Sequence, residues 1–201
     1  MLPPHAGRVL QIVAGSLLAI VVLLVGLGAV LPRRWHVEQA IMINAPPSAI
    51  HAWVNDLQHW TDWAQWDQEA LSPRNDVSSP STGPGARLTW YGRANGRGDV
   101  ASGTVHVVRS DPKLGVWFES HMGDDPASEA ALTYTPRPGV TEVTWRDEGQ
   151  LPPIVGGLFR DLFQQRLSRH MAVGLQRLKD LVEHHPPATD TAATGVEPLA
   201  P

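Results

Sequence analysis

The sequence contains no cysteine among its 201 residues. This absence excludes a disulfide framework, a zinc site built on thiolates, an iron–sulfur cluster and a cysteine nucleophile. Charged residues are also scarce, at 18% of the chain against roughly 25% in an average soluble domain. The net charge of −4 gives no general basic surface of the kind that nucleic-acid readers use, so we expect no nucleic-acid partner.

The missing charge is concentrated in one place, since no Asp, Glu, Lys or Arg occurs between Arg8 and Arg33. Residues 9–31 form an apolar run of 23 residues, of which 15 are Leu, Ile or Val. A helix of this length reaches roughly 35 Å at about 1.5 Å per residue, enough to cross a hydrocarbon core of about 30 Å. The sequence therefore predicts one transmembrane helix over 9–31, and with it a single-pass protein of the cell membrane whose first partner is the lipid bilayer.

Two alternatives to a membrane span are a cleaved signal peptide and a buried core helix. A signal peptide has an apolar region of about 7–15 residues and ends at a small-x-small site. Here the run is longer and passes through Pro32 into Arg33 and Arg34 without such a site. A core helix that is apolar on every side has little room in a one-domain protein. One basic residue, Arg8, precedes the run, and two, Arg33 and Arg34, follow it. Because cytoplasmic flanks carry more Lys and Arg, this difference favours a cytoplasmic globular domain.

The remainder of the chain predicts an α+β domain over 34–185. Alternation indicates a strand over 35–44, and the break at 45–48 leads into a short helix to about Asp56 and a further helical turn to Trp66. Turn residues then divide the chain into short segments whose connections are too short for parallel crossovers, so we expect an antiparallel meander. The expected strands are 66–71, 86–91, 99–109, 114–121, 129–135 and 140–150.

A long helix is predicted from Pro153 to about His184, because apolar residues recur there at three- and four-residue spacing. We expect this stripe to be the cover of the sheet's apolar face. Residues 186–201 are small and polar without periodicity, which predicts a disordered tail. The helix residues expected to be buried include Leu162, Leu167, Met171 and Leu178.

Residues 43–50 read INAPPSAI and are followed by Asp56-Leu57 and by tryptophans at 60, 63 and 66, and residues 139–145 read GVTEVTW. These segments, with the closing helix, resemble the polyketide cyclase/dehydrase-like proteins of the START and birch-pollen-allergen (SRPBCC) superfamily. The resemblance implies a helix-grip fold, in which a seven-stranded antiparallel sheet surrounds a long C-terminal helix and an apolar cavity. It implies no catalytic residue and no cofactor, because the superfamily has no shared catalytic set.

Eight tryptophans are consistent with an aromatic-lined ligand cavity, but for any single tryptophan ordinary core packing is the better interpretation. Val143 shares one strand face with Trp145, and Leu88 shares one with Trp90, so both pairs can turn toward the long helix. Trp35 follows the predicted membrane boundary and is expected to be an interfacial anchor. The residues expected to contact an apolar ligand are Leu88, Trp90, Phe118, Tyr134, Val143 and Trp145.

No catalytic or metal-binding constellation is visible. Histidines 59, 106 and 121 are far apart and form no ligand motif, so we expect no metal site. Gly103 is expected to mark a bend or bulge in its strand. Asp147 shares the face of Val143 and Trp145 and is the one carboxylate that alternation places there, although no partner for it can be named from the sequence.

Three functions remain open at this point. The first is a membrane-anchored module that binds a lipid or other apolar small molecule without chemistry. The second is a cyclase/dehydratase-type enzyme that uses the same cavity to orient a substrate. The third is a partner-binding domain whose cavity is filled by its own side chains.

Overall fold

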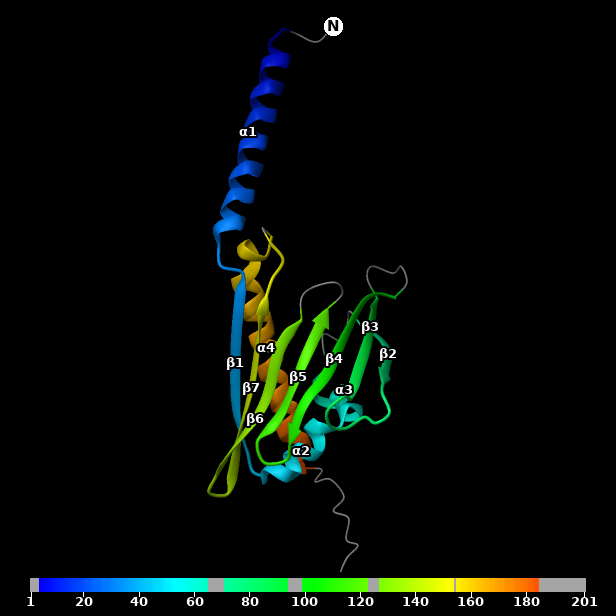
Figure 1. The fold of residues 1–201 in the computed structure, drawn as a ribbon. Helices are drawn as coiled ribbons and strands as arrows, with labels where there is room; N and C mark the ends of the chain where they lie inside the picture. Colours follow the sequence, from blue (N-terminus) through cyan, green and yellow to red (C-terminus); the bar gives the residue numbers. More distant parts are fainter. Residues whose placement is uncertain (1–3, 65–70, 94–98, 123–126, 154, 185–201) are drawn as a thin grey trace, which may run out of the picture.

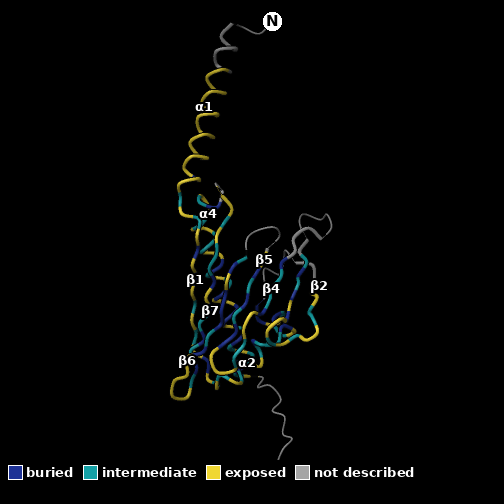
Figure 2. The backbone as a smooth tube through the Cα atoms, in the orientation of Figure 1, coloured by how far each residue is buried: buried dark blue, intermediate teal, exposed yellow. Residues whose placement is uncertain are grey.

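The computed structural model describes residues 4–64, 71–93, 99–122, 127–153 and 155–184. Trp66 and the tail at 186–201 lie outside the described residues. A long helix, α1 (Pro4–Val30), projects from a domain in which one sheet packs against helices (Figure 1). Along α1, the residues from Gln11 onward are exposed except Gly28 (Figure 2).

Seven strands form one antiparallel sheet in the order β1-β7-β6-β5-β4-β3-β2. Consecutive strands from β2 to β7 pair as a meander, and β1 pairs with β7 so that Arg34 lies opposite Gln150. The α+β helix-grip prediction is confirmed. The strands are β1 (Arg34–Ile43), β2 (Leu71–Val77), β3 (Arg87–Arg93), β4 (Asp99–Asp111), β5 (Gly115–Met122), β6 (Ser128–Arg137) and β7 (Val140–Gln150).

Four helical elements complete the domain. Three short ones follow β1 and cover part of the sheet's inner face: α2 (Pro47–Asn55), η1 (Leu57–His59) and α3 (Trp60–Trp63). The long α4 (Val155–His184) closes the described chain. Pro47 supplies the fixed φ that favours the first turn of α2, and the Asp56 side chain accepts from the Gln58 amide at the start of η1.

The second strand differs in part from its prediction. Of the expected segment 66–71, only Leu71 is described, and there it begins β2, which continues to Val77 through Pro73. Pro73 has no N–H to donate, but β2 is an edge strand and its register shifts between Leu71 and Asn75. Proline is tolerated at such an edge irregularity.

The long helix α4 runs in the same direction as β1, the other edge strand of the sheet, and covers it. The His36 amide donates to Gln164 Oε1 at 3.3 Å, and the Asn44 amide donates to Glu183 Oε1 at 2.8 Å. The strand and helix segments between these contacts are both about 27 Å long at their usual rise per residue. Helix side chains thus satisfy amides of β1 that no further strand pairs.

The apolar stripe of α4 is buried only in part. Leu167, Met171 and Leu178 are buried as predicted, but Leu162 is 48% exposed and that prediction was wrong. At 100° per residue Leu162 points about 140° away from Leu167, and Phe163 takes the inward position instead. The helix also begins at Val155 rather than Pro153.

Trp35 is not a membrane-interface anchor, because it is 8% exposed and belongs to the domain core. Its ring packs on Phe163 with centroids 4.9 Å apart, and its Nε1 donates to Asp147 Oδ1 at 2.7 Å. Gly149 lies directly opposite Trp35 on β7, and a Cβ at Gly149 would fall 2.4 Å from the indole. The missing side chain of Gly149 therefore makes the space in which Trp35 is buried.

Gly103 has the same role on the same face, nearer to the opposite edge of the sheet. It pairs with Trp90 in a regular stretch of the β3–β4 register, so the expected bend or bulge is not at this position. A Cβ at Gly103 would fall 2.0 Å from the Trp90 ring. Glycine is required here because the indole lies across the neighbouring strand.

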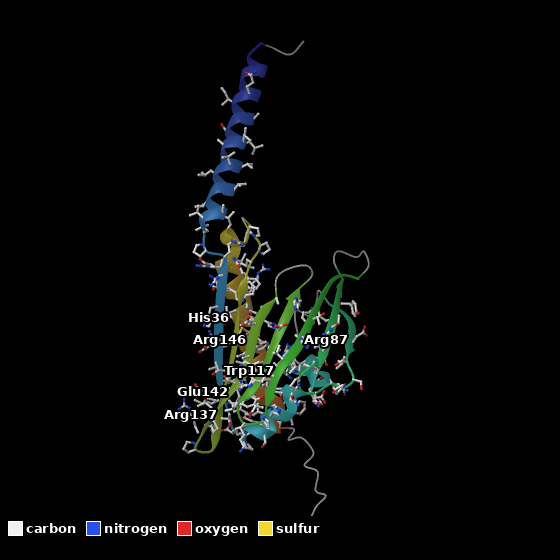
Figure 3. All side chains as sticks on the ribbon, in the orientation of Figure 1. His36, Arg87, Trp117, Arg137, Glu142 and Arg146 are labelled. Carbon is white, nitrogen blue, oxygen red and sulfur yellow. The ribbon has the colours of Figure 1, made fainter. Side chains whose placement is uncertain are left out.

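The opposite face of the sheet is polar. Residues labelled in Figure 3 alternate with the buried positions of their strands, and the guanidinium of Arg137 pairs with the Glu142 carboxylate across the β6–β7 hairpin. Glu142 therefore lies on the outer face. Trp117 also lies on this face, with the Arg109 guanidinium 3.8 Å from its ring centroid. The labelled residues are His36, Arg87, Trp117, Arg137, Glu142 and Arg146.

Candidate functional site

The six residues predicted to contact a ligand all lie on the inner face of the sheet. Their exposed fractions are 5% or less. The register joins them across strands: Leu88 lies opposite Val105, Phe118 opposite Ala130, and Tyr134 opposite Val143. The period-two pattern of each strand thus builds one apolar surface from β3 to β7.

Two tryptophans from α3 cover the middle of this inner face. Trp60 packs edge-on against Phe118 with ring centroids 4.9 Å apart, and Trp63 packs edge-on against Trp145 at 5.7 Å. Trp60 and Trp63 contact each other at 5.1 Å. Phe118 and Trp145 are therefore joined through α3, with one aromatic cluster shared by sheet and helix.

The remaining predicted contacts are more widely spaced. Trp90 lies opposite Gly103, near the end of the sheet where β1 begins, whereas Tyr134 lies opposite Val143, near the other end. The Tyr134 hydroxyl is within 3.4 Å of His51 Nδ1 on α2. Trp90 and Tyr134 are therefore separated by most of the strand length.

Two buried indole N–H groups in the aromatic cluster have no hydrogen-bond acceptor among the described residues. They are Nε1 of Trp63 and Nε1 of Trp145, in side chains that are 0% and 1% exposed. By contrast, Trp60 Nε1 donates to the Val54 carbonyl at 2.8 Å. Buried N–H donors are nearly always paired, so these two, like Nε1 of Trp53 on α2, are exceptions among the described residues.

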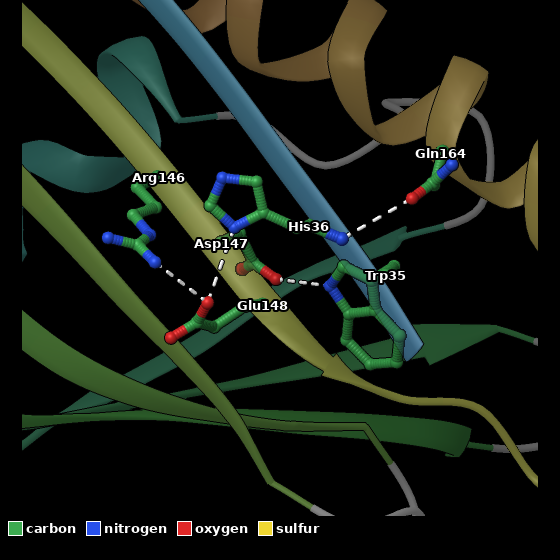
Figure 4. Close-up of polar contacts among 6 residues, drawn as sticks. All are labelled: Trp35, His36, Arg146, Asp147, Glu148 and Gln164. Atoms are coloured by element: carbon green, nitrogen blue, oxygen red, sulfur yellow. Dashed lines mark hydrogen bonds and ion pairs between the residues drawn. The ribbon is translucent and has the colours of Figure 1, made fainter. Parts of the chain in front are cut away.

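Asp147 is the carboxylate on the inner face, as alternation predicted. It is 5% exposed, and it accepts from Trp35 Nε1 at 2.7 Å and from Ser128 Oγ at 3.4 Å (Figure 4). Burial raises the pKa of Asp147, the two hydrogen bonds oppose that shift, and the charge of Glu148 adds to it. The sequence could not name these partners, because Trp35 lies 112 residues away along the chain.

The charges beside Asp147 belong to the outer face. Glu148 accepts from Arg146 at 3.0 Å and lies 3.3 Å from His36 Nδ1 (Figure 4). The hydrogen bonds from Arg146 and His36 lower the pKa of Glu148. Asp147 and Glu148 are thus neighbours in sequence with opposite environments, since successive strand residues point to opposite sides.

A second polar cluster, which the sequence analysis missed, lies where α2 meets β4 and β6. Ser110 Oγ is 2.5 Å from Asn55 Oδ1 and 3.2 Å from His51 Nε2, and the other ring nitrogen of His51 faces Tyr134. Burial lowers the pKa of His51, although the charge of Asp111 partly opposes this. His51 and Asn55 are one turn apart on α2, and that spacing was the only local signal.

No metal or catalytic arrangement emerges from the other candidates. His59 is on η1, whereas His106 and His121 lie on the neighbouring strands β4 and β5, two register positions apart. The described part of the chain contains no cluster of three or more potential metal ligands. His59 lies 3.6 Å from Asp62 at the surface and stacks near Trp53. The three histidines belong to three separate elements, and for this reason they form no short ligand motif in the sequence.

Solved structures share this fold at low sequence identity. The protein TTHA0849 of Thermus thermophilus is 22% identical with a TM-score of 0.57, covering 74% of this chain and 97% of its own. The Aha1 dimer of Colwellia psychrerythraea is 19% identical with a TM-score of 0.52, covering 75% of this chain and 97% of its own. These similarities establish the fold alone.

DynU16, a protein from the dynemicin biosynthetic locus, is 18% identical with a TM-score of 0.53. The match covers 76% of this chain but only 48% of DynU16, so the chain spans about half the length of that protein. No relative is detected among curated proteins. A family described as polyketide cyclase/dehydrase and lipid transport matches residues 34–183, from the start of β1 to the end of α4. The chain therefore belongs to the polyketide cyclase/dehydrase and lipid transport family.

Proposed function

We propose that this protein is a membrane-anchored module that binds a lipid or other apolar small molecule on the inner face of its sheet. The proposed ligand has an apolar chain and one hydrogen-bond acceptor. The family description, which includes lipid transport, supports the apolar part of this proposal. The observation that supports the acceptor is the pair of buried, unpaired indole N–H groups of Trp63 and Trp145.

The proposed orientation of the ligand follows from the inner face. Its acceptor, a carbonyl, carboxylate or hydroxyl oxygen, receives hydrogen bonds from the Trp63 and Trp145 indoles. Its chain lies along the face formed by the six predicted residues, in the direction of Leu88 and Trp90. A buried donor left unpaired costs about 1–3 kcal/mol, so a ligand that supplies an acceptor recovers free energy that a pure hydrocarbon cannot.

The binding test compares two ligands and two variants of the full chain in detergent micelles. Wild type should bind a long-chain fatty acid saturably, with a change in tryptophan emission. Trp145→Phe keeps an aromatic ring but removes one donor, and the loss of one hydrogen bond should weaken fatty-acid binding about two- to tenfold. Binding of a hydrocarbon of equal length should stay unchanged.

Trp117→Phe is the matched control, because Trp117 lies on the outer face beside Arg109. It should alter neither affinity. If no apolar ligand binds saturably to wild type, the binding proposal fails and the partner-binding function becomes the better explanation. If Trp145→Phe weakens fatty acid and hydrocarbon equally, the indole is a packing surface and not a donor to the ligand.

The anchor in this proposal is α1. Its segment Gln11–Val30 is long and apolar enough to cross a bilayer, and the residues of that segment are exposed except Gly28 (Figure 2). Large apolar side chains exposed over a whole helix are stable in lipid rather than in water. We therefore expect the protein to remain with membranes after carbonate washing. A mature chain that begins after residue 28 would identify a cleaved signal sequence instead.

The proposed side of the membrane is the cytoplasmic one. Because the chain has no cysteine, one can be introduced on the outer face as Arg87→Cys. A membrane-impermeant thiol reagent should label it only after the cells are lysed. Labelling in intact cells would reverse the orientation and leave the anchor itself unaffected.

A cyclase/dehydratase-type enzyme is the second candidate, favoured by the contacts of His51 with Tyr134 and Ser110. With its pKa lowered by burial, His51 is a neutral imidazole at pH 7 that can accept a proton. Native mass spectrometry separates the two candidates. A ligand of the same mass in wild type and Tyr134→Phe indicates binding alone, whereas ligands differing by one water indicate dehydration.

A further inference from the structure

We infer that the first two turns of α4 are a second membrane contact, in which Leu158, Phe159 and Leu162 enter the bilayer interface beside the end of α1. We call these three residues the interfacial segment. The inference rests on the proposed membrane span of α1, and it adds to it how the globular domain meets the membrane.

The first support is exposure. Leu158, Phe159 and Leu162 are 36%, 54% and 48% exposed, whereas the later stripe residues of the same helix are buried against the sheet. Three large apolar side chains exposed within five residues form a patch of the kind that marks a protein or membrane contact. Leu158 and Leu162 point away from the inward face of α4 that Phe163 and Leu167 occupy, so the sheet does not cover them.

The second support is position. A Cβ at Gly157 would fall 2.7 Å from the Gly28 carbonyl oxygen and 2.9 Å from Leu31 Cβ. Gly157 therefore touches the last turn of α1, as the two chain segments do in Figure 1. Its neighbours Leu158 and Phe159 lie at the depth where the apolar span ends, and Leu162 lies about 7 Å further along α4.

The third support is the short connection between α1 and β1. Only residues 31–33 separate Val30 from Arg34, and they span at most about 11 Å when extended. Arg33 is also bound to the domain, since its carbonyl accepts from the Leu151 amide at 3.0 Å and its Nη1 donates to the Leu151 carbonyl at 3.2 Å. The domain cannot move away from the bilayer without breaking these contacts.

The bilayer is the occupant because the exposed apolar surface of α1 continues directly into the interfacial segment. Charged groups border the patch: Arg33 directly precedes β1, Arg34 begins it, and Arg160 is paired with Asp161 at 2.8 Å. Basic residues are favoured where apolar surface meets the headgroup layer. An aromatic ring such as that of Phe159 suits burial at the same depth.

This orientation has a functional consequence. The beginning of β1 and the end of β7 lie at the end of the sheet next to α1, and the antiparallel order places the end of β3 there too. Trp90, near the end of β3, is a predicted ligand contact at this end of the sheet. A lipid could then pass between the bilayer and the inner face without diffusion of the protein through water.

The test uses the full chain and its lack of cysteine. Phe159→Cys and, as a matched control, Val173→Cys are labelled with a fluorescent thiol reagent and reconstituted into vesicles of phosphatidylcholine and phosphatidylglycerol. Val173 is also an exposed apolar residue of α4, 46% exposed, about 21 Å further along the helix. Lipids with a nitroxide on the acyl chain should quench the label at 159 and leave the label at 173 unquenched.

The outcomes separate this inference from the proposed anchor. If the protein floats with the vesicles but 159 is quenched only by a water-soluble quencher, α1 is the anchor and the inference is overturned. If label pairs at 159 instead quench each other, a second copy covers the patch and the inference is also overturned. If the protein does not float with the vesicles, both proposals fail. Unchanged tryptophan emission in each variant verifies that the domain is folded.

Discussion

The two halves of α4 have similar apolar spacing and different surroundings. Five apolar residues of the second half are buried against the domain, whereas Leu158, Phe159 and Leu162 in the first half are exposed. The buried five are Leu167, Met171, Leu175, Leu178 and Val182. Trp35 and Phe163 lie where the halves meet. An apolar stripe on a helix therefore predicts that this face is shielded from water, but it does not show whether protein or lipid shields it.

The largest expected effect separates the two halves directly. Leu178 is 0% exposed and Leu162 is 48% exposed. Leu178→Ala should lower the free energy of unfolding by about 2–5 kcal/mol, because it removes buried methyl groups and leaves a cavity. Leu162→Ala should change it by less than about 0.5 kcal/mol in micelles. Denaturant unfolding of the full chain, followed by tryptophan emission, measures both.

Equal losses in these two variants would mean that the first half of α4 is gripped as tightly as the second. Losses below about 0.5 kcal/mol in both would mean that the sheet does not grip the helix at all. Either result contradicts the comparison, because the difference in exposure would have no energetic counterpart.

The next effect concerns the junction between the halves. Asp147→Ala leaves the Trp35 N–H without its acceptor, whereas Asp147→Asn keeps an oxygen in the same position. We expect the Ala variant to be less stable than the Asn variant by about 1–3 kcal/mol. Indistinguishable unfolding midpoints would show that the hydrogen bond to Asp147 does not hold Trp35 in the core.

Asp147 also predicts a pH dependence. Its pKa is raised by burial, so the folded protein holds this proton at a pH where the unfolded chain has released it. The contribution of Asp147 to stability is therefore greatest below its unfolded value, near pH 4, and is lost as the pH rises through the raised native value. Asp147→Asn should abolish this part of the pH profile of unfolding, and an unaltered profile would rule out Asp147 as its source.

The smallest effect is expected at the far end of the domain, at His51. Burial lowers its pKa, so its contribution to stability is present above the unfolded value near 6.5 and is lost as the pH falls. Asp111 raises the pKa of His51, so Asp111→Asn should lower it further, as observed by NMR titration of the imidazole. If the His51 pKa rises in this variant, the charge of Asp111 does not raise that pKa, and the prediction is wrong.

Several features of the protein followed from local sequence. Alternation placed Val143, Trp145 and Asp147 on one inner face, short turns required an antiparallel meander, and the run without charge required a long apolar helix. Each depends on residues that are close together in the chain, where the period of a strand or helix determines which side chains share a face.

Other features were decided only by the tertiary structure. Trp35 is buried because Gly149 leaves space for its ring and Asp147 accepts from its N–H, and both belong to the last strand. Leu162 is exposed because Phe163, and not Leu162, takes the inward position next to Trp35. His51 finds Ser110 and Tyr134 on strands 59 and 83 residues away. Burial and hydrogen bonding depend on which distant segments meet. The periodicity of one segment shows which of its residues share a face, but it does not show which other segment packs on that face.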